Sequence, residues 1–184
     1  SGKKERAILI DYTKKAILFA RTIGCGNLVF GNPRNRDTED MDKDLPVAID
    51  FFREIGDFAA AHHTVIALEP NPVIYNTRFM NRTEQAVEIA YKVNSRGIMV
   101  NVDLGAMIYN EEDIGYLKQI AEFINHVHIS EPGLVPIVRR ELHKELFALL
   151  RLINYDNYVS VEMGRQNDME AVKKVMDYVN DMRQ

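Results

Sequence analysis

The sequence predicts an α/β protein built on a parallel sheet, and two observations indicate this fold. Short apolar runs of strand length alternate with longer segments whose apolar residues recur at helical spacing. The strand candidates are also continuous apolar runs, as expected for strands that are covered on both faces. Strands separated by single helices form βαβ units, and the strands of such units run parallel.

The predicted elements begin with a helix. Residues 5–23 place apolar side chains at helical spacing, and Gly24 ends the segment. A short apolar strand at 27–31 follows, and a polar loop then leads to a helix at 46–61. The same alternation predicts later strands at 64–69, 97–103, 126–129 and 158–162, and helices at 82–93, 111–124, 138–152 and 168–182.

The chain length narrows the architecture to two alternatives. The chain has 184 residues, of which 46% are hydrophobic and 27% charged, and this suits a single domain over residues 1–184 with a sizeable core. A closed (β/α)₈ barrel usually needs about 250 residues. Five predicted strands therefore favour either an open doubly wound sheet or part of a barrel.

Composition restricts the function class and the compartment. No apolar run approaches the roughly 20 residues that a membrane span needs, and no secretory signal is recognisable. Cys25 is the single cysteine, which excludes an internal disulfide or a thiolate metal cluster and favours a reduced, cytoplasmic setting. The net charge of −4 argues against a nucleic-acid partner.

Four of the five predicted strands end in a side chain that can bind a metal ion. Taken singly, each of these side chains could instead cap a loop or pair with an arginine. Because parallel strands end at one edge of a sheet, which in barrels is the catalytic face, their common phase favours a shared site. Three carboxylates and one imidazole suit Mn²⁺, Mg²⁺, Co²⁺ or Zn²⁺. The four residues are Glu69, Asp103, His128 and Glu162.

Four segments carry a resemblance to a known family. They resemble the last strands of the xylose isomerase-like TIM-barrel superfamily, which groups sugar phosphate isomerases and epimerases such as D-tagatose 3-epimerase with the more remote endonuclease IV. The resemblance implies a partial TIM barrel of about five parallel strands with outer helices, the C-terminal part of a (β/α)₈ barrel lacking the first three strands. The segments are EPNPVIYNTRFMNRTEQA, VNVDLGAMIYNEED, HVHISEPGLVPI and YVSVEM.

The same resemblance implies a site and a reaction. The four strand-end residues would hold one divalent metal, and Glu69 and Glu162 would also act as acid and base on opposite faces of a sugar. The metal would acidify a C–H beside the carbonyl of a keto sugar or sugar phosphate, and proton transfer through an enediolate would isomerise or epimerise it. Ala106 stands where such epimerases usually carry a histidine, which leaves the exact substrate open.

Five further residues are candidate substrate contacts. Arg34 and Arg36 lie in the loop after the first strand and suit a sugar hydroxyl or phosphate, although both could be solvated loop charges. Asn71 and Tyr75 follow the second strand and are expected to line the pocket. Glu131 is expected to bind a substrate hydroxyl or to orient the metal ligands.

Two other functions stay open at this point. One is a phosphodiesterase resembling endonuclease IV, a chemistry that uses several zinc ions and many histidines, whereas this chain has five histidines. The other is a non-catalytic barrel fragment whose open sheet edges attract partners. For the leading hypothesis we expect a small sugar or sugar phosphate as the partner, neither nucleic acid nor membrane, and a homo-oligomer that covers the edges.

Overall fold

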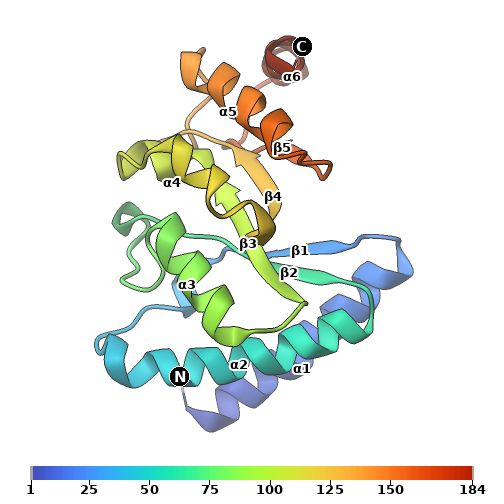
Figure 1. Ribbon diagram of the computed structural model, residues 1–184, viewed down its shortest axis with the longest axis vertical. Helices are drawn as coiled ribbons and strands as arrows, with labels where there is room; N and C mark the ends of the chain where they lie inside the picture. Colours follow the sequence, from blue (N-terminus) through green and yellow to red (C-terminus); the bar gives the residue numbers. More distant parts are fainter. Residues whose placement is uncertain (1, 184) are drawn as a thin grey trace.

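The protein is described by a computed structural model of residues 2–183. Within this range five strands form one sheet in the order β1-β2-β3-β4-β5, and every neighbouring pair is parallel (Figure 1). This sequential order confirms the half-barrel, because the strand order of a doubly wound sheet reverses at a switch point. The strands are β1 (Asn27–Phe30), β2 (Val65–Leu68), β3 (Ile98–Asp103), β4 (Ile124–Ile129) and β5 (Val159–Val161).

Helices cover one face of the sheet. Helices α2 and α3 pack on β2 and β3, and α1 packs beside α2 (Figure 1). No helix in the described range is both long and apolar enough to cross a membrane. The α-helices are α1 (Lys3–Thr22), α2 (Met41–Ala61), α3 (Thr83–Val93), α4 (Leu104–Tyr109), α5 (Glu141–Leu152) and α6 (Met169–Arg183), and the 3₁₀ helices are η1 (Pro33–Asn35), η2 (Val73–Tyr75), η3 (Ile114–Lys118), η4 (Ala121–Phe123) and η5 (Pro132–Leu134).

One predicted helix, at 111–124, is wrong. The carboxylate of Asp103 accepts a hydrogen bond from the backbone N–H of Ala106 at 2.6 Å, so α4 begins directly after β3. Glu111 then adopts a φ of 53°, which ends that helix, and Asp113 caps the short η3 through the N–H of Gly115. Helix α2 also begins earlier than predicted, because Asp40 caps its first turn.

The sheet is strongly curved. The amide of Asn125 on β4 donates to the side-chain oxygen of Asn27 on β1 at 2.6 Å. In a flat sheet β1 and β4 would lie about 14 Å apart, since neighbouring strands are about 4.8 Å apart. Asn125 is the extra residue of a bulge, because Val100 pairs with Ile124 and the next residue of β3 pairs with His126. The bulge turns the Asn125 side chain toward the concave side of the sheet, where it reaches Asn27 on β1.

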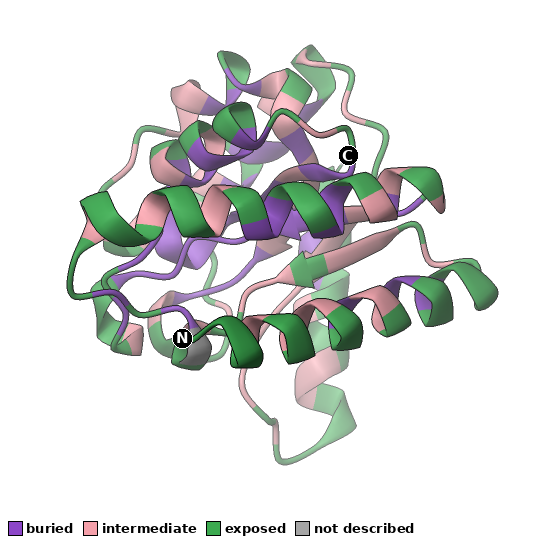
Figure 2. Cartoon of the chain, turned by 90° about the horizontal axis from the view of Figure 1, so that it is seen from below, coloured by how far each residue is buried: buried purple, intermediate pink, exposed green. Residues whose placement is uncertain are grey.

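The two faces of the sheet differ in chemistry. The convex face carries buried apolar side chains such as Ile66, Val100 and Val127, which form the core with apolar side chains of the helices. Figure 2 shows buried segments along the strands and on parts of the helices, while much of the helical surface is exposed. Residues that alternate with these point to the concave side and include Asn101, His126 and other polar groups. The concave side therefore holds the polar groups that a functional site requires, and the convex side supplies the core.

Candidate metal centre

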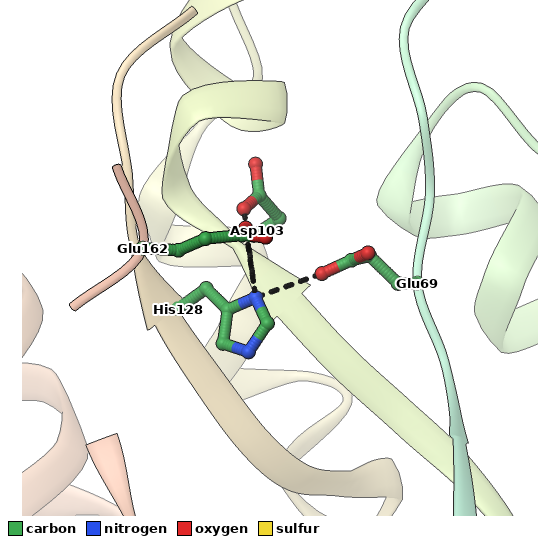
Figure 3. Close-up of side chains that lie close together, drawn as sticks. All are labelled: Glu69, Asp103, His128 and Glu162. Atoms are coloured by element: carbon green, nitrogen blue, oxygen red, sulfur yellow. Dashed lines mark ion pairs between the residues drawn. The ribbon is translucent and has the colours of Figure 1, made fainter. Parts of the chain in front are cut away.

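Four side chains from four strands converge at the carboxyl end of the sheet. Each contributes one nitrogen or oxygen atom, and these four atoms all lie within 4.8 Å of one another. Figure 3 shows Glu162 entering from the left and Glu69 from the right, with both carboxylates directed at the same imidazole nitrogen of His128. The residues are Glu69 directly after β2, Asp103 at the end of β3, His128 in β4 and Glu162 directly after β5.

The spacing of these atoms fits a single metal ion. Nδ1 of His128 lies 2.8 Å from Oε1 of Glu69, 3.2 Å from Oε2 of Glu162 and 3.9 Å from Oδ2 of Asp103. Two ligand atoms that are each about 2.1 Å from one ion lie about 3–4 Å apart, which is close to the three distances from this nitrogen. Three carboxylates and one imidazole are also a donor set that divalent ions accept. The cluster could hold a metal.

Asp103 is held by hydrogen bonds to both of its oxygens. Oδ1 accepts from the N–H of Ala106, and Oδ2 accepts from the hydroxyl of Ser130 at 2.6 Å. The Ser130 oxygen in turn accepts from the N–H of Gly105 at 2.8 Å, and Ser130 is fully buried. These contacts fix the carboxylate in one orientation before any ligand binds.

Glu69 is held by a tight space and by one amide. The side-chain N–H of Asn101 donates to Oε1 of Glu69 at 2.5 Å. On the other side lies Gly31, where an added Cβ atom would come within 1.9 Å of Oε2 of Glu69. Only a glycine leaves room for this carboxylate, so the residue after β1 helps to position a ligand that follows β2.

Glu162 is held more loosely. Its side chain is 41% exposed, whereas that of Glu69 is 9% exposed. Among the described residues, the one ion pair of its side chain is with His128, at 3.2 Å. It follows β5, which is three residues long and pairs with β4 alone in this range.

The electrostatics of the cluster favour a positive charge at its centre. Burial raises the pKa of Asp103 to about 6, and the charge of Glu69 adds to this effect, while the hydrogen bond from Ser130 opposes it. Burial alone would lower the pKa of His128, but its contacts with Glu162 and Glu69 outweigh burial and raise the pKa to about 10. A group of carboxylates that attracts a proton this strongly also attracts a divalent cation.

Three of the predicted substrate contacts, Asn71, Tyr75 and Arg34, lie beside the cluster. Asn71 and Tyr75 line a cavity of about 150 Å³ that also touches Glu69, Asp103 and Glu162. The Tyr75 hydroxyl accepts a hydrogen bond from the N–H of Gly133 at 3.0 Å, so the loops after β2 and β4 meet above β3.

A wider, more open space of about 540 Å³ adjoins the cluster from the side of β1. Arg34 lines it, together with Glu69, His128 and Glu162. Arg34 is exposed and is the one cation among the residues that line these two spaces, apart from the imidazole itself.

The other two predicted substrate contacts are bound to protein groups. Arg36 is buried and donates to the backbone carbonyls of Phe30 and Glu69, at 3.3 and 2.7 Å. Glu131 is 2% exposed and forms a two-pronged ion pair with Arg140, at 2.6 and 2.8 Å. These contacts stabilise the loops after β1 and β4, and neither side chain lines the spaces beside the cluster.

Sequence reasoning missed Gly31, Asn101 and Ser130. The signal for Asn101 was present, because it lies two residues before Asp103 in an otherwise apolar strand and therefore shares its face. His126 shares the concave face with His128, and its Nε2 lies 2.9 Å from the hydroxyl of Ser160. His143 in α5 is fully buried against Tyr178.

Comparison with known proteins gives a family and a fold. The model of the family described as xylose isomerase-like TIM barrel matches residues 1–182. The apo 3-keto-D-glucoside 4-epimerase from E. coli is 20% identical, with a TM-score of 0.82 over 94% of this chain and 70% of that one. The D-psicose 3-epimerase from Clostridium cellulolyticum H10, solved with D-tagatose, is 16% identical, with a TM-score of 0.85 over 99% and 71%.

A third similar structure is that of the IolI protein with a bound zinc atom. It is 20% identical, with a TM-score of 0.80 over 100% of this chain and 72% of that one. At these identities the likeness establishes the fold, and each of the three neighbours extends beyond the part that this chain matches. No curated protein matches this chain in sequence.

Proposed function

The chain belongs to the xylose isomerase-like TIM barrel family, and from this premise we propose that its site serves metal-dependent isomerisation or epimerisation of a keto sugar or sugar phosphate. One observation carries the proposal: Glu69 and Glu162 flank a common point from opposite sides, 2.8 and 3.2 Å from the same imidazole nitrogen. Two carboxylates on opposite sides of a substrate are what proton removal and return require.

The residues that would hold the ion are the four of the cluster, with Mn²⁺, Mg²⁺, Co²⁺ or Zn²⁺ as candidates. When bound, a divalent ion supplies a Lewis acid that polarises a carbonyl and acidifies the neighbouring C–H. Among the neighbours, the IolI protein was solved with zinc, and this supports zinc as one candidate here.

The glutamates are the candidate acid and base because each retains an unoccupied oxygen. Within residues 2–183, Oε2 of Glu69 and Oε1 of Glu162 accept no hydrogen bond, so each can face a substrate C–H or hydroxyl. One glutamate would remove the proton, and the other would deliver a proton to the opposite face or to the adjacent carbon. Asp103 has both oxygens engaged, so its role is to hold the metal.

Substrate contacts are proposed for Arg34, Asn71 and Tyr75. All three line the spaces beside the cluster, and Arg34 adds a positive charge that suits a sugar phosphate or hydroxyl. We leave Arg36 and Glu131 out of the substrate site because their charged groups are engaged by protein partners.

We further propose that activity requires a closed barrel. In the described range β1 and β5 each pair with a single strand, and Glu162 lies beside the β5 edge. The neighbouring epimerases extend beyond the matched region, which supports the idea that three further strands or another copy of this chain cover these edges. Measurement of the molar mass in solution, with and without such a segment, tests this part.

The cluster favours sugar chemistry over phosphodiester hydrolysis. The one group of metal-binding side chains found among the described residues contains a single histidine. Hydrolysis resembling that of endonuclease IV is expected to use several zinc ions and many histidines, so a group with one histidine does not favour it.

The decisive experiment is solvent exchange at carbon. Keto sugars and their phosphates are incubated in D₂O with the protein and added Mn²⁺ or Mg²⁺, and deuterium uptake at the carbon beside the carbonyl is followed by mass spectrometry. The proposal predicts uptake into at least one substrate and its loss in Glu69→Gln and Glu162→Gln. A barrel-complete protein that binds metal but exchanges none of the panel would contradict it.

A further inference from the structure

Asn101 lies at the centre of the ligand cluster without being one of its ligands. It is in β3, two residues before Asp103, and its side chain is fully buried on the concave side of the sheet. Its Nδ2 donates to Oε1 of Glu69 at 2.5 Å and lies 3.2 Å from Nδ1 of His128. One amide thus contacts two of the four atoms that would bind the metal.

The orientation of this amide follows from its neighbours. If the amide were flipped, its oxygen would lie 2.5 Å from a carboxylate oxygen of Glu69, and two acceptors at that distance repel each other. The nitrogen must therefore face Glu69. As a consequence Oδ1 points away and is buried without a hydrogen-bond partner among the described residues.

This arrangement is unfavourable for folding. A buried polar atom without a partner lowers stability, and an apolar side chain at the same position would avoid that loss. The strand is otherwise apolar, with Val100 and Val102 fully buried on either side. The presence of Asn101 at this position is therefore best explained by its contacts with the candidate ligands Glu69 and His128.

We propose that Asn101 is a positioning residue for the metal site, a role that rests on the proposed function. Its neutral amide fixes Oε1 of Glu69 beside Nδ1 of His128 without adding a charge to the cluster. A hydrogen-bond donor that holds a ligand reduces the freedom which that ligand loses on binding the ion. Loss of the amide should therefore weaken metal binding although all four ligands remain.

The test compares Asn101→Ala with Asn125→Ala. Both variants remove one asparagine amide from the concave side, but Asn125 donates to Asn27 at the opposite end of the sheet, away from the cluster. The probe is Co²⁺ alone, titrated into the metal-free protein. The readouts are the dissociation constant, the visible absorption of bound Co²⁺, and the melting temperature of the metal-free protein.

We expect Asn101→Ala to raise the Co²⁺ dissociation constant about 10- to 100-fold and to alter the Co²⁺ absorption, whereas the metal-free melting temperature should fall no further than in Asn125→Ala. Asn125→Ala should leave the dissociation constant and the absorption unchanged. If Asn101→Ala fails to fold, Asn101→Leu fills the space and carries the same expectation.

Two results would overturn the inference while the metal site stands: wild-type Co²⁺ affinity in Asn101→Ala, or equal weakening in Asn101→Ala and Asn125→Ala. Failure of the proposed function gives a different pattern, because the wild-type protein would then bind no Co²⁺ at all, and that result would overturn both.

Discussion

The candidate metal ligands on the inner strands and the candidate ligand at the edge of the sheet are held in different ways. Asp103 and Glu69 are buried, and hydrogen bonds from Ser130 and Asn101 fix their carboxylates. Glu162 follows the short edge strand β5, is 41% exposed, and forms an ion pair with His128 but accepts no hydrogen bond from a backbone N–H or from Ser or Asn side chains in the described range. The inner part of the site is therefore preorganised by the fold, whereas the edge part depends on whatever covers β5.

This difference is consistent with separate roles for the carboxylates, metal binding for some and proton transfer for others. A carboxylate with both oxygens engaged keeps its position and suits a structural ligand, as Asp103 does. A carboxylate with a free oxygen can exchange a proton with a substrate, as Glu162 can. Glu69 combines both features, because one oxygen is held by Asn101 and the other faces the space beside Gly31.

The largest expected effect is the loss of turnover when the edge glutamate is neutralised. In the complete barrel Glu162→Gln should lower the rate of C–H exchange by about 10²- to 10⁴-fold, the usual contribution of a general acid or base. Calorimetric titration should show that Mn²⁺ still binds, because three ligands and one amide oxygen remain. Exposed Glu170 supplies the control variant Glu170→Gln. Near wild-type exchange by Glu162→Gln would exclude it as an acid or base.

A second expected effect concerns the space beside Glu69. A Cβ atom at Gly31 would occupy the position of the carboxylate, so Gly31→Ala should displace Glu69 and weaken metal binding about 10- to 100-fold. Thermal unfolding should change little, because the atom that moves is the end of a side chain. Gly26→Ala is the matched control, since its added Cβ meets nothing within 4 Å. Equal metal affinity in both variants would show that Glu69 is not confined by Gly31.

A third prediction compares two serines, one inner and one at the edge. Ser130→Ala removes the acceptor of the Gly105 N–H and the donor to Oδ2 of Asp103, and should lower the free energy of unfolding by about 1–3 kcal/mol. Ser160→Ala removes a half-buried contact with His126 and should cost less, about 0.5–1 kcal/mol. Urea unfolding of both variants provides the measurement. A larger loss for Ser160→Ala would reverse the proposed contrast between centre and edge.

The smallest expected effect is at Tyr75, in the loop after β2 that lines the cavity beside the cluster. Tyr75→Phe removes the acceptor of the Gly133 N–H and should weaken the contact between the two loops by about 0.5–1.5 kcal/mol. Because the ring remains, we expect a several-fold rise in KM for the substrate with little change in kcat or in metal affinity. A large fall in kcat would instead give Tyr75 a part in the chemistry.

The fold and the ligand cluster followed from the sequence because both depend on strand position. Parallel strands end at one edge, so the sequence predicts that the four strand-end side chains meet there: Glu69, Asp103, His128 and Glu162. The predicted helix at 111–124 was wrong because the cap formed by Asp103 starts α4 at Leu104, and the left-handed backbone of Glu111 ends it before the predicted segment.

The partners of individual side chains could not be predicted in the same way. Arg36 and Glu131 lie in loops on the expected side of the sheet, but the backbone carbonyls and the arginine that engage them are brought close only by the folded loops. The position of Asn101 was indicated by its alternation with Asp103, whereas its contacts with Glu69 and His128 depend on the curvature of the sheet and on the register of three strands.

The central claim is that four strand-end side chains form one metal site, and a metal titration tests it most directly. Wild-type protein and His128→Ala are each titrated with Mn²⁺ by calorimetry, and the stoichiometry and dissociation constant are compared. The account predicts one ion per chain for the wild-type protein, and binding at least about 100-fold weaker for His128→Ala, because His128 contacts the other ligands at the centre of the cluster. Equal affinity in both proteins, or more than one equivalent site that survives the substitution, would contradict it.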